Sequence, residues 1–524
     1  MEYTFDFCSP PDAMGPYVLY RDQIRPALER ERAALDAMYD PEIGRPETDP
    51  VLVMGICLLQ IMERLADRAA IRACLFDVRW RLALGLAADW AGLDASSLCH
   101  FRKRLCEHGQ ASLVLDAGLA AMRKAGYLKM RGAVRIDSTH MLGLVAAMSR
   151  LECVRETLRL TLEFLRAFGG EAAWEPWFSR YADQEPEELR HRSAERTRAG
   201  MTQAGLDTQA VLAKADALGD AVRAAEPVQL LRRVYDEQFV VSDTVAVRPV
   251  SAAGAVQNPH DPEAQWSTKN SLGKAGWVGY KLQVCETVPE GTCAKGEPTP
   301  AVITAVVTQP ATASDFTSMD EVLEQHVQLG QEKPQTVHVD AGYISAAKLA
   351  EAEQDRLEIC GPIPAPPHGA DRFGSDDFDV DLDRRQTICP AGLTSARCSF
   401  IREAYSSRSF YYFEWAPSAC EPCAIRQQCI SSRTKQTFRS LQVNEHYMHA
   451  QRRRRLCRTP DYRKRMQRRN GVEGTISELK RAYGIRRLRY RGLAKNGLLS
   501  CLAAAACNLR RWSARIHWLN RRKA

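Results

Sequence analysis

The sequence predicts a mixed α/β protein in which an all-helical N-terminal domain precedes a core that contains strands. Three observations support this: helical periodicity over residues 17–125, two short segments with apolar residues at alternate positions, and a cysteine-rich stretch after residue 364. The chain has 524 residues, so we expect several domains of the usual ~100–150 residues. Its composition, 45% apolar and 26% charged, is that of a globular protein with sizeable cores.

Residues 1–128 are expected to form the helical domain, which could also bind DNA. "PALERERAALDAMY" (26–39) has helical periodicity. In "DWAGLDASSLCHFRKRL" (89–105) a turn separates two helices, and Ser96 or Ser97 is the expected N-cap of the second. A helix-turn-helix DNA reader and a plain helical bundle both fit, because this turn pattern is weakly specific.

Two segments, "AVRIDST" (133–139) and "TVHVDAGY" (336–343), show the alternation of a buried strand. Each continues through an aspartate into small or turn-forming residues, so Asp137 and Asp340 are expected at the carboxyl ends of core strands. Ligands and catalytic groups gather at that edge of α/β sheets. Aspartate is also a common turn former, so the matched context of the pair is more informative than either residue alone.

The core is expected to comprise residues 129–365 and 458–515. A charged, strongly helical insertion occupies about 141–240, and 516–524 form a basic tail. Other predicted elements are the strands "WVGYKLQVCETV" (277–288), "AVITAVVT" (301–308) and "RLEICGPI" (356–363), and a helix at 313–327.

A cysteine-rich insertion is predicted at 366–457. The chain has 17 cysteines and no recognisable export signal, which argues for reduced thiols or metal ligands rather than disulfides. One cysteine followed by a C-x₂-C-x₅-C group suits a structural, tetrahedral zinc site, although a redox C-x-x-C and unrelated buried cysteines are alternatives. Cys398 could replace one of the expected zinc ligands, which are Cys389, Cys420, Cys423 and Cys429.

The positive charge of the chain is concentrated at its end. Residues 451–524 contain 23 Lys and Arg against 3 Asp and Glu, whereas the rest of the chain carries 49 basic and 61 acidic residues. A polyanion, with nucleic acid as the first candidate, is the expected partner. A solvated basic helix, or one that pairs with the acidic body, is the alternative. The longest apolar runs fall short of the ~20 residues that span a bilayer, so we expect a cytoplasmic protein without a membrane partner.

One acid, Glu473, stands inside this basic region. On a helix, Arg469, Glu473 and Lys480 lie within about 40° of one another. This face would suit a metal-bound phosphate, and an ordinary i,i+4 ion pair between Arg469 and Glu473 is the alternative. Gly471 and Gly474 weaken a helix that only has to be solvated, and they favour a close approach of the backbone to another group.

Asp137, Asp340 and Glu473 thus form a candidate set of metal ligands. Phosphodiester chemistry with two Mg²⁺ ions uses such hard oxygen donors: one ion activates water or a 3′-hydroxyl, and the other stabilises the leaving oxygen.

These motifs resemble those of bacterial DDE-class insertion-sequence transposases, which have a ribonuclease-H-like catalytic domain. "RIDST" resembles the strand of the first aspartate, "VHVDAGY" the D-x-G-Y motif of the second, and "RRNGVEGTISELKRAYGIRRLRYRG" the terminal block with R-x₃-E-x₆-K spacing. "WVGYKLQV" is similar to the Y-G-Y-K strand, with Trp277 in the first aromatic place. The helical N-terminus and the cysteine insert before the glutamate resemble one branch of the family. Met466 departs from the family, which often has tyrosine there.

The resemblance implies hydrolytic nicking at terminal inverted repeats, followed by attack of the freed 3′-hydroxyl on target DNA. Asp137, Asp340 and Glu473 would bind two Mg²⁺ ions. The partners would be double-stranded DNA and further copies of the chain, in a homodimer or higher oligomer associated with the nucleoid. The expected phosphate contacts are Arg469, Lys480, Lys269, Lys281, Arg486 and Arg487.

Two other functions fit the same residues. One is a transposase-derived DNA-binding protein without catalysis. The other is a metal-dependent nuclease that does not rejoin strands. Incubation with end-containing DNA and Mg²⁺ separates the three, because only a transposase gives both nicks and joined products.

Overall fold

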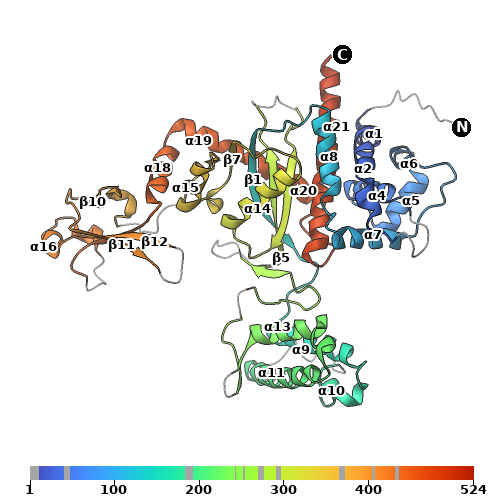
Figure 1. Ribbon diagram of the computed structural model, residues 1–524, viewed down its shortest axis with the longest axis horizontal. Coiled ribbons are helices and arrows are strands. Elements are labelled where there is room, and N and C mark those ends of the chain that lie inside the picture. Colours follow the sequence, from blue (N-terminus) through green and yellow to red (C-terminus); the bar gives the residue numbers. More distant parts are fainter. Residues whose placement is uncertain are drawn as a thin grey trace.

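The structure is a computed structural model that describes residues 11–40, 48–182, 193–241, 244–251, 254–268, 276–290, 297–364, 372–403, 408–430 and 436–523. A central sheet carries two projecting lobes, and a long C-terminal helix separates it from the N-terminal helices (Figure 1). The predicted mixed α/β class with a helical N-terminal region is therefore confirmed. Lys269 lies outside the described residues.

The N-terminal helices pack around apolar α4 and against the last helix, α21, in one hydrophobic core. Asp94, and not Ser96 or Ser97, caps α7: its carboxylate accepts the Ser96 N–H at 2.8 Å. Asp94 directly precedes the helix, two and three residues before Ser96 and Ser97, which lie within its first turn, and its side chain reaches the free amide. The helices are α1 (Pro11–Leu19), α2 (Arg25–Arg30), α3 (Arg32–Asp36), α4 (Pro50–Glu63), α5 (Asp67–Phe76), α6 (Val78–Leu84), α7 (Ala95–Glu107) and α8 (Leu113–Lys124).

The face of α7 that could read DNA is restricted by packing. Phe101 and Arg102 are buried, and the Arg102 guanidinium is bonded to Asp67 at 2.6 Å. Cys99, His100 and Lys103 are exposed. Any contact with bases would therefore come from the exposed positions and not from Arg102.

The central sheet is built on β1 (Ala133–Leu142), which pairs antiparallel with β5 (Trp277–Thr287) on one side and parallel with β7 (Thr336–His338) on the other. The strand β6 (Ile303–Pro310) pairs with β5, and β8 (Glu358–Cys360) with β7. A short strand, β4 (Gln265–Ser267), also pairs with β5. Asp137 is not at a strand end as expected, because β1 continues along β5 as far as Leu142.

Helices cover both faces of the sheet. On one face, α14 (Asp315–Gln328) and α15 (Ala346–Gln354) pack on a core that includes Val134 and Ile136. On the other, the apolar part of α21 (Leu493–Lys523) packs against β6. Residues 516–523, which we expected to be a separate tail, continue this helix.

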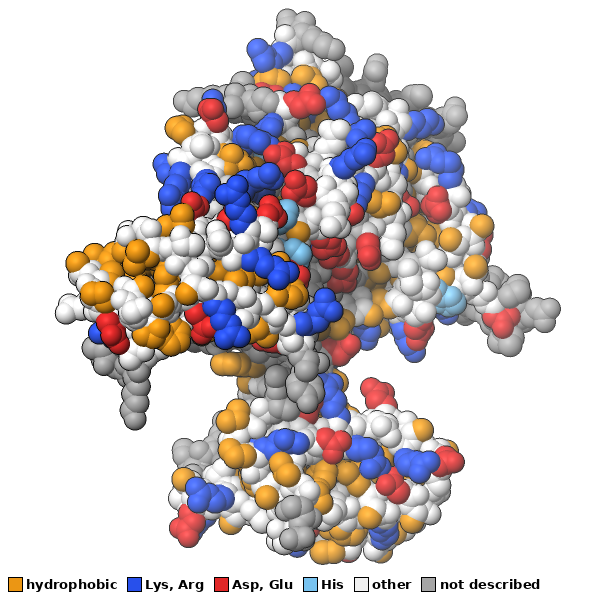
Figure 2. Space-filling view, turned by 60° about the vertical axis from the view of Figure 1, so that its left-hand side comes forward, with side chains coloured by type: hydrophobic (Ala, Val, Ile, Leu, Met, Phe, Trp, Pro, Cys, Tyr) orange, Lys and Arg blue, Asp and Glu red, His pale blue; other side chains and the backbone are white. Residues whose placement is uncertain are grey.

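The helical insertion forms a lobe with its own hydrophobic core (Figures 1 and 2). A short hairpin of β2 (Phe239–Val241) and β3 (Val245–Val247) follows its last helix. Its helices are α9 (Arg150–Leu165), α10 (Trp177–Tyr181), α11 (Ala194–Asp216), α12 (Asp220–Arg223) and α13 (Glu226–Gln238).

The cysteine-rich region forms the second lobe. "SFYYFEW" (409–415), an aromatic segment, supplies the middle strand of three. The strands are β9 (Asp379–Asp381), β10 (Gln386–Ile388), β11 (Arg397–Arg402), β12 (Ser409–Glu414) and β13 (Ser440–Asn444), with short helices α16 (Pro417–Cys420) and α17 (Arg426–Cys429).

Basic helices lead from this lobe back to the sheet. They are α18 (Tyr447–Cys457), α19 (Pro460–Met466) and α20 (Gly471–Ala482), and a 3₁₀ turn (Gln467–Asn470) separates the last two. The continuous helix expected over 461–484 is thus interrupted at this turn. Figure 2 shows Lys and Arg side chains gathered on this part of the surface.

Candidate active site

The two aspartates stand at matching distances from the pairing of two neighbouring parallel strands, Asp137 within β1 and Asp340 just past the end of β7. Arg135 of β1 pairs in register with His338 of β7, and two residues beyond this pair stand Asp137 and Asp340. The Asp137 carboxylate accepts the N–H of Ser138 at 2.8 Å, and its side chain is only 16% exposed. Both acids are therefore fixed by the sheet.

The loop after β7 explains the D-x-G-Y motif. Asp340 caps a short 3₁₀ turn by accepting the Gly342 N–H at 2.8 Å. A Cβ on Gly342 would stand 3.0 Å from the Asp340 carboxylate and 3.5 Å from that of Asp315. Tyr343 is fully buried and donates its hydroxyl to Gln283 at 2.5 Å. The capping bond of Asp340, the tight fit of Gly342 and the buried Tyr343 together hold Asp340 beside β1.

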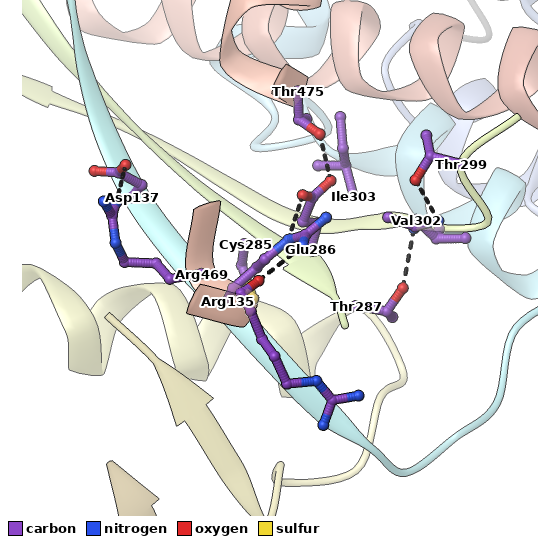
Figure 3. A network of polar contacts seen from close by, with 12 residues as sticks. Arg135, Asp137, Cys285, Glu286, Thr287, Thr299, Val302, Ile303, Arg469 and Thr475 are labelled. Atoms are coloured by element: carbon purple, nitrogen blue, oxygen red, sulfur yellow. Dashed lines mark hydrogen bonds and ion pairs between the residues drawn. The ribbon is translucent and has the colours of Figure 1, made fainter. Parts of the chain in front are cut away.

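Glu473 reaches the same place from α20, with Arg469 between it and the strand. The Arg469 guanidinium donates to Asp137 at 2.7 Å and to Glu473 at 2.9 Å (Figure 3 shows the Asp137 contact). Glu473 is 62% exposed, whereas Arg469 is 20% exposed. The i,i+4 ion pair that was the alternative to a phosphate-binding face is therefore present, and Arg469 also bonds to the first aspartate.

Electrostatics shows that the other two acids influence Asp137. Burial raises the pKa of the Asp137 carboxyl above its usual value. The Ser138 amide and Arg469 oppose this shift, and the negative charges of Asp340 and Glu473 add to it. Among the described residues, however, no three His, Cys, Asp or Glu side chains are close enough together to hold one metal ion. In this structure Asp137 and Glu473 share Arg469 instead.

The expected phosphate contacts differ in accessibility. Lys281 is 15% exposed, and its ammonium donates to Asp315 at 3.3 Å and to the carbonyl of Ala313. Lys480 is half-buried in the last turn of α20. Arg486 and Arg487 are exposed, and their backbone runs beside Leu142 at the end of β1.

A second, buried cluster lies directly behind the acids, and the sequence analysis missed it. It joins Arg135 and Glu286, cross-strand partners on β1 and β5, to Thr475 of α20 and Arg511 of α21 (Figure 3 shows Arg135, Glu286 and Thr475). The signal was present: Arg135 lies between two apolar residues of β1, and Glu286 follows two apolar residues of β5, so each charge stands next to apolar residues of its strand. A charge is almost never fully buried unless it is paired.

Four cysteines converge in the cysteine-rich lobe on one small cavity of about 20 Å³. Burial, with Arg439 opposing it and the other three cysteines adding to it, raises the pKa of the Cys429 thiol to about 11. The Arg439 amide donates to the Cys420 sulfur at 3.5 Å. Cys398 does not line this cavity, which is formed in part by Cys389, Cys420, Cys423 and Cys429.

Comparison with known families identifies the terminal segment. Residues 388–513 match a family described as a transposase DDE domain, and residues 17–104 match a transposase domain (DUF772). In these two segments the chain is similar to transposases. No curated protein and no solved structure gives a match.

The DDE-domain match covers Arg469, Glu473, Lys480 and the four clustered cysteines, whereas Asp137 and Asp340 lie outside both matched segments. The two matches support a transposase function, for which DNA is the substrate, and DDE transposases generally use a divalent metal. None of the described helices is long and apolar enough to cross a membrane.

Proposed function

We propose that the chain is the DNA transposase of an insertion sequence, which binds terminal inverted repeats and catalyses metal-dependent strand cleavage and strand transfer. One observation carries this proposal. Asp137 lies within β1 and Asp340 lies just past the end of the adjacent parallel strand β7, each two residues beyond the register pair Arg135–His338, and Arg469 connects Asp137 to Glu473 of the DDE-domain segment. The strand order, with β1 between antiparallel β5 and parallel β7, is compatible with the proposed ribonuclease-H-like core.

Three carboxylates are the proposed ligands of two Mg²⁺ ions: Asp137, Asp340 and Glu473. Their donor chemistry fits, because Mg²⁺ prefers carboxylate and phosphate oxygens, and the cluster has more acids than its single arginine neutralises. When bound, the ions would activate the attacking oxygen and stabilise the leaving one. Sheet and loop fix the two aspartates, while Glu473 is exposed and can adjust to a ligand.

The chain's own cations would hold the DNA. Arg469 is bonded to two of the acids, so in a complex it would exchange a carboxylate for a phosphate oxygen. Arg486 and Arg487 are exposed beside the end of β1, five residues beyond Asp137, and would bind the backbone next to the reacting bond. Assembly on DNA as a homodimer or higher oligomer is part of the proposal.

The test uses the full-length protein and a labelled duplex carrying the inverted repeats found just outside the gene. With Mg²⁺ and a target plasmid we expect nicks at the repeat end and joined products. Nicks without joined products would identify a nuclease, and binding without either would identify a DNA-binding protein.

We also propose that Cys389, Cys420, Cys423 and Cys429 bind one structural zinc ion, with sulfurs about 2.3 Å from the metal. Their convergence on one cavity supports this proposal, and so does the amide donated to a sulfur. Metal analysis should give about one zinc per chain. Cys423→Ala should lose it, and the matched variant Cys398→Ala should keep it. A protein that contains no zinc after metal-replete purification would reject the site.

A further inference from the structure

A buried cluster of charges fixes the start of the helix that carries Glu473. Arg135 donates from Nε to Glu286 at 2.7 Å, and from Nη1 to the backbone carbonyl of Arg468 at 2.9 Å. One side chain of β1 therefore holds the backbone immediately before Arg469. The proposed metal ligand Asp137 stands two residues further along β1, on the same face of the sheet as Arg135.

Glu286 connects this anchor to the helix itself. Its side chain is fully buried, and it accepts hydrogen bonds from Thr475 at 2.6 Å and from Arg511 at 3.2 Å (Figure 3 shows the Thr475 contact). Arg511 also donates to the Thr475 hydroxyl at 2.7 Å and pairs with Glu478 at 2.7 Å. Two arginines thus meet two glutamates, so the cluster is neutral and every member is paired.

The contacts with the buried cluster all lie on one side of α20. On the geometry of α20, positions 471, 475 and 478, which face the cluster, fall within about 60° of one another, and Glu473 points about 170° away from the middle of that arc. One face of α20 therefore packs against the cluster, and the opposite face carries Glu473 toward Asp137.

Gly471 is required by this arrangement. A Cβ at that position would stand 1.9 Å from Nη1 of Arg135, so a side chain there would push the guanidinium off its carbonyl and glutamate partners. Gly474, on the same helix, has nothing within 4 Å of such a Cβ. The close approach expected for both glycines exists only for Gly471.

We propose that Arg135, Glu286 and Thr475 are positioning residues that set the location of Glu473 relative to Asp137 and so determine metal affinity. Buried ion pairs contribute little net stability compared with apolar packing, and their best-attested role is to fix one arrangement among several. This inference rests on the proposed function, because it assumes that Asp137 and Glu473 are metal ligands.

The test measures Mn²⁺ binding to the full-length protein without DNA, with free Mn²⁺ quantified by electron paramagnetic resonance. Gly471→Ala should weaken binding about tenfold or more, the usual effect of disturbing a partner that orients a ligand. Gly474→Ala is the matched control: it adds the same methyl group to the same helix, and affinity should stay within about twofold, since nothing is displaced. Thr475→Val, which removes one hydroxyl from the cluster at nearly constant volume, should also weaken binding.

The outcomes separate the two hypotheses. If Asp137→Asn binds Mn²⁺ as tightly as the wild type, the proposed metal site is wrong. If Asp137→Asn loses binding while Gly471→Ala binds like Gly474→Ala, the positioning role is overturned. A merely structural role would lower the melting temperature of Gly471→Ala and leave the Mn²⁺ affinity of the folded protein unchanged. Should Gly471→Ala fail to fold, Thr475→Val decides by the same criterion.

Discussion

Strand β1 carries two charged clusters only two residues apart, and they differ in balance and exposure. The one around Arg135 joins two arginines to two glutamates and is closed to solvent on nearly every member. The one around Asp137 opposes its acids with a single arginine and includes the exposed Glu473.

The difference separates a structural role from a binding role. A neutral, fully paired cluster needs no further ligand and restricts the elements that it joins. A cluster with excess negative charge is unfavourable by itself, and burial together with the neighbouring acids raises the pKa of Asp137 accordingly. Addition of a cation relieves that repulsion, so an unbalanced cluster is prepared to bind one.

The largest expected effect comes from removing one acid of the unbalanced cluster. Asp340→Asn should lower DNA cleavage at least about 10³-fold, because a proposed metal ligand is lost. DNA binding without metal should be nearly unchanged, and the melting temperature should not fall, since one of several repelling charges is gone. Cleavage, gel-shift and calorimetry measure the three quantities.

The matched control is Asp320→Asn. Asp320 lies on α14, away from the site, and its carboxylate pairs with Lys348. It should leave cleavage intact. An Asp340→Asn protein that cleaves normally would remove this residue from the site.

Removing an acid of the balanced cluster, the one around Arg135, should instead lower the stability of the fold. Glu286→Ala leaves Arg135 and Arg511 buried without their shared partner, and we expect a loss of about 3–5 kcal/mol in the free energy of unfolding. Urea unfolding followed by tryptophan fluorescence measures it. Glu358→Ala, which breaks an exposed pair with Arg465, should cost less than about 1 kcal/mol. Equal losses in the free energy of unfolding would mean that the buried cluster contributes no more to stability than an exposed ion pair.

The other face of β5 provides a further contrast with the two charged clusters, because a buried ionisable side chain there stays uncharged. Next to Glu286 in the chain is Cys285, whose side chain faces α14 and the imidazole of His326. Burial lowers the pKa of His326 to about 4 from the usual 6.5. The folded protein therefore binds fewer protons than the unfolded chain between these values, and stability falls as the pH drops from 6.5 toward 4.

His326→Gln should remove this part of the pH dependence, at most about 3 kcal/mol. Melting temperatures of both proteins at pH 7 and pH 5 provide the measurement. A wild-type protein that loses no more stability than the variant over this interval would show that His326 is not buried in its neutral form.

Short-range pattern predicted much of the fold. The apolar alternation in "WVGYKLQVCETV", "AVITAVVT" and "RLEICGPI" corresponds to β5, β6 and β8, because each strand is buried on the expected faces. The position of Asp137 within β1 was wrong, since the end of a strand depends on its partner: β5 continues the ladder past the aspartate. The N-cap of α7 was wrong by two or three residues for the local reason that Asp94 reaches the free amide first.

The candidate site was harder to derive because its geometry depends on register between distant segments. Arg135 and Glu286 are 151 residues apart, and only the pairing of β1 with β5 makes them partners. Likewise, Arg469 was expected to bind phosphate, but nothing local indicates that it also bonds to Asp137, 332 residues away. Gly471 and Gly474 look equivalent in sequence, and only the fold distinguishes them.

The smallest expected effect concerns the arginines of the basic C-terminal region, which the structure divides in the same way as the acids. Arg511 is buried and forms ion pairs with Glu286 and Glu478, whereas Arg487 is exposed beside the end of β1. If Arg487 contacts a phosphate, Arg487→Ala should make the log–log salt dependence of DNA binding shallower by about 0.9 and weaken binding to all sequences alike. Arg198→Ala, at an exposed site in the helical lobe, should leave the slope unchanged. Equal shifts in both variants would mean that the slope reports overall charge, and the assignment of this surface to DNA would lose its support.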